Sequence, residues 1–214
     1  MEKRILVTGA GGYIGRHVVQ ALCDKGADVW AVDFHTEGID SRANLLNTAI
    51  FSGDEDIFQQ LGNPDACLHM AWRDGFVHNS DAHMVDLSKH YTFIRNMVKG
   101  GLQQIAVMGT MHEVGYWEGA IDEDTPCNPI SMYGIAKDAL RRSTMLLAET
   151  ENVCWQWLRA YYIYGDDTRN HSIFTKICAA AEAGQKTFPF NTGKNKYDFI
   201  TVAELAGQIA ACVM

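Results

Sequence analysis

Short apolar runs alternate with amphipathic stretches along the 214 residues of the chain. Brief runs rich in β-branched residues are typical of buried strands, and apolar residues repeated every three or four positions are typical of helices. Strands are predicted at about residues 3–8, 28–33, 48–52, 65–71, 103–109 and 153–160. Helices are predicted at about residues 13–25, 54–61, 79–99, 131–150, 170–184 and 201–213.

Strands that alternate with helices in this way form a parallel sheet with helices on both faces. Right-handed crossovers then give a doubly wound, Rossmann-type α/β fold that binds its ligand at the carboxyl ends of the strands. The longest irregular stretches, about residues 111–130 and 185–198, follow strands at this ligand-binding edge. Loops at such an edge commonly carry function, so we expect both stretches to border the site.

A glycine-rich turn joins the first predicted strand to the first predicted helix. Gly9, Gly12 and Gly15 follow the apolar run Ile5-Leu6-Val7 with the spacing G-x-x-G-x-x-G. We expect Gly9 to allow a tight turn, Gly12 to let the backbone approach phosphates, and Gly15 to let the helix lie close to the strand. Such a turn directs backbone N–H groups and a helix N-terminus toward a pyrophosphate. The turn predicts a dinucleotide site, and an ordinary strand–turn–helix connection is the alternative.

Asp33 ends the second predicted strand, 18 residues after Gly15. An acidic residue at about this distance accepts hydrogen bonds from the ribose hydroxyls and would repel the 2′-phosphate of NADP. None of Ala10, Gly11 and Phe34 offers a positive charge to that phosphate. The sequence therefore predicts NAD rather than NADP, with an acid that merely ends a strand as the alternative.

Tyr133 and Lys137 form a Y-x-x-x-K pair near the start of a long predicted helix, where they share one face. A lysine ammonium favours the phenolate of a neighbouring tyrosine, lowers its pKa, and can bind the nicotinamide ribose. Thr110 ends the fifth predicted strand and can place its hydroxyl beside that of Tyr133. The three residues predict hydride transfer at a carbonyl carbon, with Tyr133 exchanging the proton. An exposed helix pair and a strand-end hydroxyl are the alternatives.

Polar residues after the fourth and fifth predicted strands are further candidates. Arg73 could meet a substrate phosphate or carboxylate, or could form a surface ion pair with Asp74. His112 and Glu113 could assist proton transfer near Thr110, or could be polar loop residues.

His83, Asp86 and His90 share one face of a predicted helix, which we interpret as a polar or interface face rather than a metal site. No metal is therefore expected. The cysteines lack C-x-x-C spacing, so we expect buried free thiols in a reducing cytoplasm rather than zinc ligands or disulfides. They are Cys23, Cys67, Cys127, Cys154, Cys178 and Cys212.

The composition narrows the class of protein. Apolar residues make up 47% of the chain, which is enough for a sizeable core. The net charge of −8, from 26 acidic and 18 basic residues, argues against nucleic-acid or anionic-membrane partners. Because the sequence contains no long apolar run and no signal peptide, we expect neither a membrane span nor export, and hence a cytoplasmic protein.

The ordered motifs resemble those of the extended short-chain dehydrogenase/reductases, the NAD-dependent epimerase/dehydratase group. The resemblance runs from residue 3 to about residue 210. The matching segments are Thr8–Gly15, Asp33, Gly53-Asp54, His69-Met70-Ala71-Trp72, Thr110 with Val114-Gly115, Glu123-Asp124-Thr125-Pro126, Tyr133 with Lys137, Leu158-Arg159, Tyr164-Gly165 and Asp198-Phe199-Ile200-Thr201-Val202.

The resemblance implies a role for each matching residue. Catalysis would rest on Thr110, Tyr133 and Lys137. Substrate contacts are expected from Arg73 and His112, because of their positions after the fourth and fifth predicted strands, and from Tyr162, which stands where an asparagine is common in the family. The residues expected to bind NAD are Gly9, Gly12, Tyr13, Ile14, Gly15, Asp33, Asp54, Ala71, Trp72, Tyr133 and Lys137.

The chain also departs from the family pattern. Met111 and His112 follow Thr110 where hexose 4,6-dehydratases carry Asp-Glu, which argues against that dehydration chemistry. Tyr197 stands where many nucleotide-sugar enzymes place an arginine for the diphosphate, although Lys194 and Lys196 are close.

The resemblance implies an NAD-dependent oxidoreductase or epimerase that acts at a carbonyl or hydroxyl of a sugar, with a nucleotide-sugar as the expected substrate. A non-catalytic NAD-binding or sensor protein is the alternative, and the combination of Thr110, Tyr133 and Lys137 argues against it. The resemblance also implies a possible homodimer through the helices predicted at 79–99 and 131–150.

Because family members are usually longer, we divide the chain into an NAD-binding domain, residues 1–164, and a partial or minimal substrate-side segment, residues 165–214. We expect the dinucleotide site to be complete and the sugar side to be open to solvent.

Overall fold

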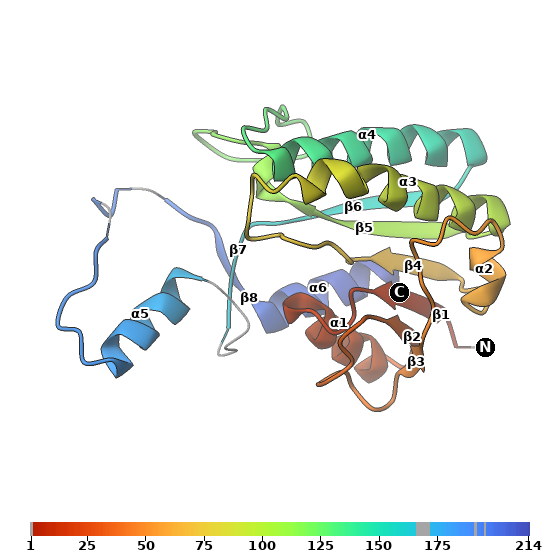
Figure 1. The fold of residues 1–214 in the computed structure, drawn as a ribbon, viewed down its shortest axis with the longest axis horizontal. Coiled ribbons are helices and arrows are strands. Elements are labelled where there is room, and N and C mark those ends of the chain that lie inside the picture. The colour runs from red at the N-terminus through yellow and green to blue at the C-terminus, as the bar shows by residue number, and fades with distance from the viewer. Residues whose placement is uncertain (1, 166–171, 191, 195) are drawn as a thin grey trace.

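The computed structural model describes residues 2–165, 172–190, 192–194 and 196–214. In the described part of the chain, six parallel strands form the main sheet in the order β3-β2-β1-β4-β5-β6, the doubly wound arrangement expected from the sequence (Figure 1). The strands are β1 (Arg4–Thr8), β2 (Asp28–Val32), β3 (Asn44–Leu46), β4 (Ala66–His69), β5 (Gln104–Thr110) and β6 (Cys154–Ala160).

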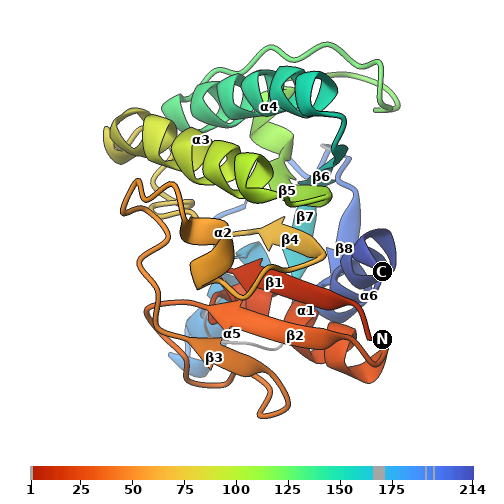
Figure 2. The same cartoon turned by 90° about the vertical axis from the view of Figure 1, so that its right-hand side faces the viewer.

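Helices cover both faces of this sheet, as the alternation of strands and helices predicts (Figure 2). The helices α3 and α4 lie on one face, and α1 and α6 lie on the other. The segment that carries α5 extends away from this body. The helices are α1 (Tyr13–Asp24), α2 (Ile57–Gln60), α3 (Ala82–Gly100), α4 (Met132–Glu151), α5 (Ile173–Glu182) and α6 (Val202–Val213), and the 3-10 turn η1 is Met111–Glu113.

The central strands β1 and β4 are apolar on both faces because each face is covered. Ile5 and Val7 of β1 pack toward α1 and α6, whereas Leu6 packs toward α2 and α3. Successive side chains of a strand point to opposite faces, so a strand between two helix layers is a continuous apolar run. This explains why the strands were visible in the sequence.

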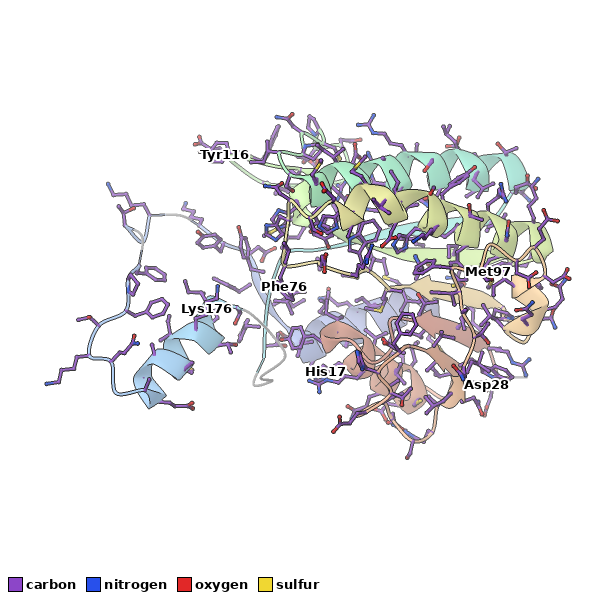
Figure 3. The ribbon with its side chains drawn as sticks, viewed as in Figure 1. His17, Asp28, Phe76, Met97, Tyr116 and Lys176 are labelled. Carbon is purple, nitrogen blue, oxygen red and sulfur yellow. The ribbon has the colours of Figure 1, made fainter. Side chains whose placement is uncertain are left out.

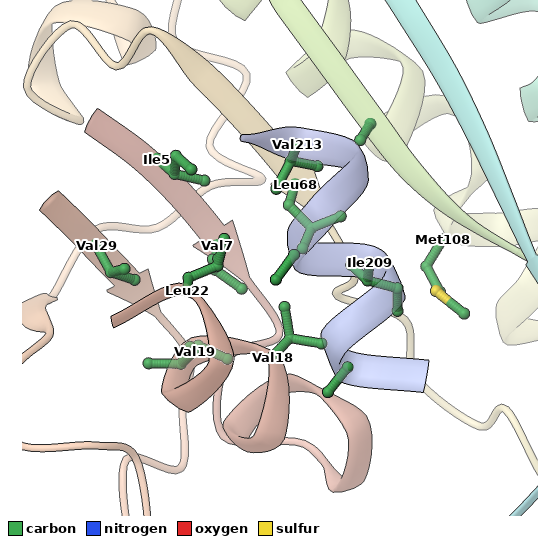
Figure 4. Close-up of a cluster of buried hydrophobic side chains, with 14 of the residues drawn as sticks. Ile5, Val7, Val18, Val19, Leu22, Val29, Leu68, Met108, Ile209 and Val213 are labelled. Atoms are coloured by element: carbon green, nitrogen blue, oxygen red, sulfur yellow. The ribbon is translucent and has the colours of Figure 1, made fainter. Parts of the chain in front are cut away.

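The last helix, α6, completes the layer that α1 begins. Thr201 and Glu204 form a capping box that starts α6. Ile209 and Val213 then lie in one core cluster with Val18 of α1, as Figure 4 shows. The division of the chain at residue 164 remains a proposal. Although α6 follows that residue in the sequence, it packs in the core of the part that precedes it.

A second small sheet lies outside the main one and was not expected. Its strands β7 (Tyr162–Tyr164) and β8 (Phe199–Thr201) are parallel, with Tyr162 opposite Phe199. They bracket the segment that carries α5, so this excursion starts and ends at one place on the body (Figure 1). Residues 170 and 171, where a helix was predicted to begin, lie outside the described residues.

The predicted third strand, residues 48–52, is wrong. The structure places β3 at Asn44–Leu46, where Asn44 Nδ2 donates to Asp28 Oδ1 of β2. The strand is only three residues long and lies at the exposed edge of the sheet, so its two leucines form too short a run to be recognised as a strand. Ile50 and Phe51 instead lie in a turn and pack against the core. Their apolar character therefore reflects burial and does not indicate a strand.

Two predicted elements are shorter than expected. The helix predicted at 54–61 is reduced to α2, because the Asp54 carboxylate accepts the backbone N–H of Asp56 and so favours a turn over a helix. The strand predicted at 65–71 ends at His69, because the backbone N–H groups of Met70 and Ala71 donate to the side chain of Thr8.

All six cysteines are free, as expected, but the prediction that they are buried is wrong for most of them. Cys67 on β4 is buried, and Cys23 and Cys127 are half-buried. Cys154, Cys178 and Cys212 are exposed, because apolar neighbours in the sequence do not decide which side of a strand or helix faces the core. None of the described helices combines the length and apolar character needed to cross a bilayer.

If α6 is part of the core around the main sheet, Ile209→Ala should lower the free energy of unfolding by about 2–4 kcal/mol, because it leaves a cavity. The exposed neighbour Gln208 provides the matched control, and Gln208→Ala should change this energy by less than about 0.5 kcal/mol. Urea unfolding followed by tryptophan fluorescence measures both. Equal effects of the two substitutions would contradict the packing described for α6.

Candidate active site

The glycine-rich turn between β1 and α1 is closely packed against the end of β4. Gly9 has a φ of +70°, and a Cβ added there would lie 2.6 Å from the backbone nitrogen of Ala71. A Cβ at Gly15 would lie 2.1 Å from the carbonyl oxygen of Gly9, so α1 approaches the strand only because residue 15 has no side chain. Gly12 precedes α1 and cannot cap it with a side chain, which leaves the first turn to a ligand.

Asp33 is joined directly to this turn. Its Oδ2 accepts the backbone N–H of Gly11 at 2.9 Å, and its Oδ1 accepts that of His35 at 3.0 Å. A Cβ at Gly11 would lie 1.7 Å from the carbonyl oxygen of His35. The spacing of the glycines did not indicate a role for Gly11. The close approach of the His35 carbonyl oxygen shows that residue 11 must lack a side chain. The cradle of the turn beside a fixed carboxylate fits the pyrophosphate and ribose of NAD.

Thr8 fixes the backbone of Ala71 against the turn. Its Oγ1 accepts the backbone N–H groups of Met70 at 3.2 Å and of Ala71 at 3.3 Å. The hydroxyl proton is then free to be donated to Nδ1 of His69, 2.8 Å away. A contact of Ala71 with NAD stays a prediction, and the structure places this residue at the carboxyl end of the central strands, where it could make one.

Thr110 and Tyr133 come together at the end of β5. Thr110 caps η1, accepting the backbone N–H of His112, while Ser131 caps α4 by accepting the N–H of Gly134. These two caps set the start of each helix and place the side chain of Thr110 close enough to Tyr133 to lower the pKa of its phenol. The structure thus brings together the two hydroxyl groups that the sequence predicted around one substrate oxygen.

Aromatic rings surround Tyr133. The ring centroids of His83, His112 and Trp72 lie 5.2, 5.6 and 6.0 Å from that of Tyr133. His78 is stacked with it at 6.0 Å and lies 4.0 Å from His112. Burial raises the pKa of Tyr133 to about 12, and the side chain of Thr110 acts in the opposite direction. Burial also lowers the pKa of His112.

Lys137 is fully buried one helical turn after Tyr133. Its Nζ donates to the carbonyl oxygen of Met108 at 2.7 Å and lies 4.0 Å above the ring of Trp72. Burial lowers the pKa of Lys137 to about 7, and the charge of Glu113 works against this shift. The expectation that Lys137 lowers the pKa of Tyr133 is wrong for this structure, because burial dominates that group and the ammonium faces Met108 and Trp72.

Glu113 holds the turn after Thr110 in place and is completely buried. Its Oε1 accepts the backbone N–H of Thr110 at 2.7 Å. Its Oε2 accepts Nε1–H of Trp157 at 2.8 Å and forms an ion pair with Nε of Arg159 at 2.9 Å. Both oxygens are committed to the protein, so the hypothesis that Glu113 assists proton transfer is replaced by a structural role. A buried carboxylate requires such partners.

Arg73 forms an ion pair, but not with the residue expected. Its guanidinium contacts the carboxylate of Asp86 on α3, which Lys89 also contacts, whereas Asp74 accepts the hydroxyl of Ser80. Arg73 itself is exposed at the carboxyl end of β4. An exposed ion pair is weak, so Arg73 can exchange Asp86 for a substrate phosphate at little cost.

The helix face that carries histidines is committed to the protein interior. His83 accepts a hydrogen bond from Nε1 of Trp72 and His90 forms one with His69, while Asp86 pairs with Arg73. Among the described residues, no three His, Cys, Asp or Glu side chains are grouped to hold a metal ion.

Asp54 and Tyr162 differ in their surroundings. Asp54 is exposed, and its carboxylate accepts bonds from Asp56 and Gln60, so its contact with NAD stays a prediction. Tyr162 packs in an aromatic cluster, 4.5 Å from Tyr197 and 5.6 Å from Phe199 between ring centroids.

In Figure 3, Phe76 and Tyr116 lie at the same end of the body, which faces the segment that carries Lys176.

Known proteins resemble this chain over most of its length. Residues 5–213 match the sequence model of the NAD dependent epimerase/dehydratase family. The chain is 44% identical over 212 residues to dTDP-6-deoxy-L-talose 4-dehydrogenase (NAD(+)) of Aggregatibacter actinomycetemcomitans, covering 96% of this chain and 78% of the relative. It is 25% identical to a putative UDP-glucose 4-epimerase of Methanocaldococcus jannaschii, covering 94% and 70% of the two chains.

Solved structures share the fold. UDP-glucose 4-epimerase of Thermotoga maritima, crystallised with UDP-glucose, superposes with a TM-score of 0.82 at 23% identity over 95% of this chain and 71% of that one. UDP-glucose 4-epimerase of Thermus thermophilus in complex with NAD gives a TM-score of 0.81 at 22% identity over 99% and 74%. At this identity the likeness establishes the α/β architecture.

The family match spans residues 5–213, nearly the whole chain. NAD is therefore the cofactor of this protein, and the protein is an enzyme. The chain belongs to the NAD-dependent epimerase/dehydratase family of extended short-chain dehydrogenase/reductases.

Proposed function

We propose that the protein is an NAD-dependent dehydrogenase that oxidises the 4-hydroxyl of a dTDP-activated 6-deoxyhexose. The observation that carries this proposal is the 44% identity over 96% of the chain with dTDP-6-deoxy-L-talose 4-dehydrogenase. The paired hydroxyls of Thr110 and Tyr133 support it, since oxidation of an alcohol needs a proton acceptor and a hydrogen-bonding partner at one oxygen.

In this mechanism Tyr133 takes the proton of the substrate hydroxyl while Thr110 hydrogen-bonds the same oxygen. NAD, when bound, supplies the nicotinamide ring that accepts the hydride. A phenol whose pKa is about 12 rarely gives up its proton at neutral pH, so proton abstraction by Tyr133 requires that its pKa be lower when cofactor and substrate are bound. Lys137, on the same face of α4, would bind the ribose hydroxyls.

The residues proposed to hold NAD surround the carboxyl ends of β1, β2 and β4. The glycine turn would bind the pyrophosphate, and Asp33 the adenosine ribose. The full set is Gly9, Gly12, Tyr13, Ile14, Gly15, Asp33, Asp54, Ala71, Trp72, Tyr133 and Lys137.

Substrate contacts are proposed from three sides of the Thr110–Tyr133 pair. His112 lies directly beside Tyr133, Arg73 lies after β4, and Tyr162 lies on β7. Residues 165–214, apart from α6, would form the substrate side. The exposed side chain of Arg73 is the best placed of the three to meet the diphosphate of a nucleotide-sugar.

The first test is turnover. Incubation with dTDP-6-deoxy-L-talose and NAD should produce NADH, followed by its absorbance, and a 4-keto sugar, followed by mass spectrometry. Tyr133→Phe should lower this turnover at least ~100-fold and leave NAD affinity near that of the wild type, because it removes only the acid–base group. Tyr91→Phe on α3 is the matched control. Interconversion of 4-epimers without net NADH would instead identify an epimerase.

Cofactor choice tests the role of Asp33. Calorimetric titration should show NAD binding at least ~100-fold more tightly than NADP, because the carboxylate repels the 2′-phosphate. Asp33→Asn keeps the shape and removes the charge, so it should narrow this preference to less than ~10-fold, with Asp124→Asn as the exposed control. NADP that binds the wild type as tightly as NAD would overturn the assignment.

We also propose a cytoplasmic homodimer that associates through α3 and α4. These helices expose apolar side chains, namely Met84, Val85, Ile135 and Leu146. Sedimentation should show a dimer for the wild type and a monomer for Ile135→Glu combined with Leu146→Glu, because a buried unpaired charge opposes association. Leu45→Glu, on the exposed edge strand β3, should remain dimeric. A monomeric wild type would exclude the dimer.

A further inference from the structure

The ammonium of Lys137 is buried without a carboxylate partner. The atoms that approach its Nζ are the carbonyl oxygen of Met108 and the ring of Trp72, and within the described residues no carboxylate lies at ion-pair distance. A buried charge in this position is unfavourable unless something compensates it. The face of an aromatic ring is negative and attracts a cation, most strongly when the ring is that of tryptophan and the cation is desolvated.

Trp72 is held in this position from two sides. Its Nε1–H donates to Nδ1 of His83 at 3.0 Å, so Nδ1 carries no proton and Nε2–H of His83 donates to the carbonyl oxygen of Val77 at 3.0 Å. The ring of Trp72 is also stacked on that of His90, with centroids 4.3 Å apart and planes at 18°. The indole therefore has one orientation, which the surrounding side chains determine.

His90 connects this assembly to the glycine turn. His90 Nδ1 lies 2.8 Å from Nε2 of His69, and Nδ1 of His69 lies 2.8 Å from the hydroxyl of Thr8. Burial lowers the pKa of His90 to about 3 and that of His69 well below its ordinary value. Both imidazoles are neutral, so neither competes with Lys137 for the ring of Trp72.

We propose that Trp72 is the positioning residue for Lys137: its ring face takes the place of a counter-ion, keeping the ammonium charged and fixed. This inference rests on the proposed function only for the purpose that Lys137 serves, namely binding the nicotinamide ribose.

Protonation of Lys137 then depends on Trp72. The folded-state pKa of Lys137, about 7, lies below its ordinary value of 10.5. The unfolded chain thus binds one more proton between these values, and stability rises with pH across that window. Without the ring, the folded-state pKa falls further. The other titratable groups whose charges act on Lys137 are Glu113 and the two buried histidines His69 and His90.

The experiment measures the free energy of unfolding against pH in the cofactor-free protein. In Trp72→Leu the lower end of the pH window should move down by about one pH unit, the size expected from loss of a desolvated cation–π contact. Trp72→Phe keeps a weaker ring face and should give a shift of about half a unit. In a Lys137→Met background the rise of stability between the two pKa values should vanish. Adding Trp72→Leu or Trp72→Phe should then leave the pH dependence of stability unchanged.

NAD affinity gives a second readout. Trp72→Leu should weaken NAD binding about tenfold, and adding it to Lys137→Met should cause no further loss. An unchanged pH window in both Trp72 variants would overturn the proposal, as would equal losses of NAD affinity with and without Lys137. If Trp72→Leu does not fold, Trp72→Phe decides the question alone. None of these measurements uses a sugar substrate, so a failure to oxidise dTDP-6-deoxy-L-talose would overturn the proposed function and leave this result standing.

Discussion

The buried carboxylate of Glu113 is the interaction on which the reactive end of the molecule depends. It joins the end of β5 to β6 through Thr110, Trp157 and Arg159, and so fixes the turn that carries the Thr110 hydroxyl. Without its three donors a carboxylate at this depth would be too costly to bury. The positions of Thr110, of η1 and hence of the ring-lined space around Tyr133 follow from this one charged group.

Features that depend on neighbouring residues were readable from the sequence. The apolar runs identified β1, β4 and most of β5, because a strand covered on both faces is apolar on both. The glycine turn was evident from its spacing, since glycine is needed where Gly9 meets Ala71. The pairing of Tyr133 with Thr110 followed from the topology, because parallel strands and their following helices bring such residues to one edge.

Features that depend on distant residues were not readable. The edge strand β3 is defined by its pairing with β2, and the small sheet of β7 and β8 joins segments more than thirty residues apart. The surroundings of Lys137 combine a carbonyl of β5 with the indole of Trp72, and no spacing rule relates these positions. The direction of the Tyr133 pKa shift failed for the same reason, since burial is a property of the folded whole.

The position of α6 has a consequence for how the protein is made. Val18 on α1 leaves the ribosome early, whereas its partners Ile209 and Val213 are synthesised only after the whole of the main sheet. Until they arrive, the helix that supports the glycine turn keeps an apolar side uncovered, which invites chaperone binding or aggregation. A contact of such long sequence separation also slows folding. The apolar side of α1 is therefore covered only when the last described helix has been made.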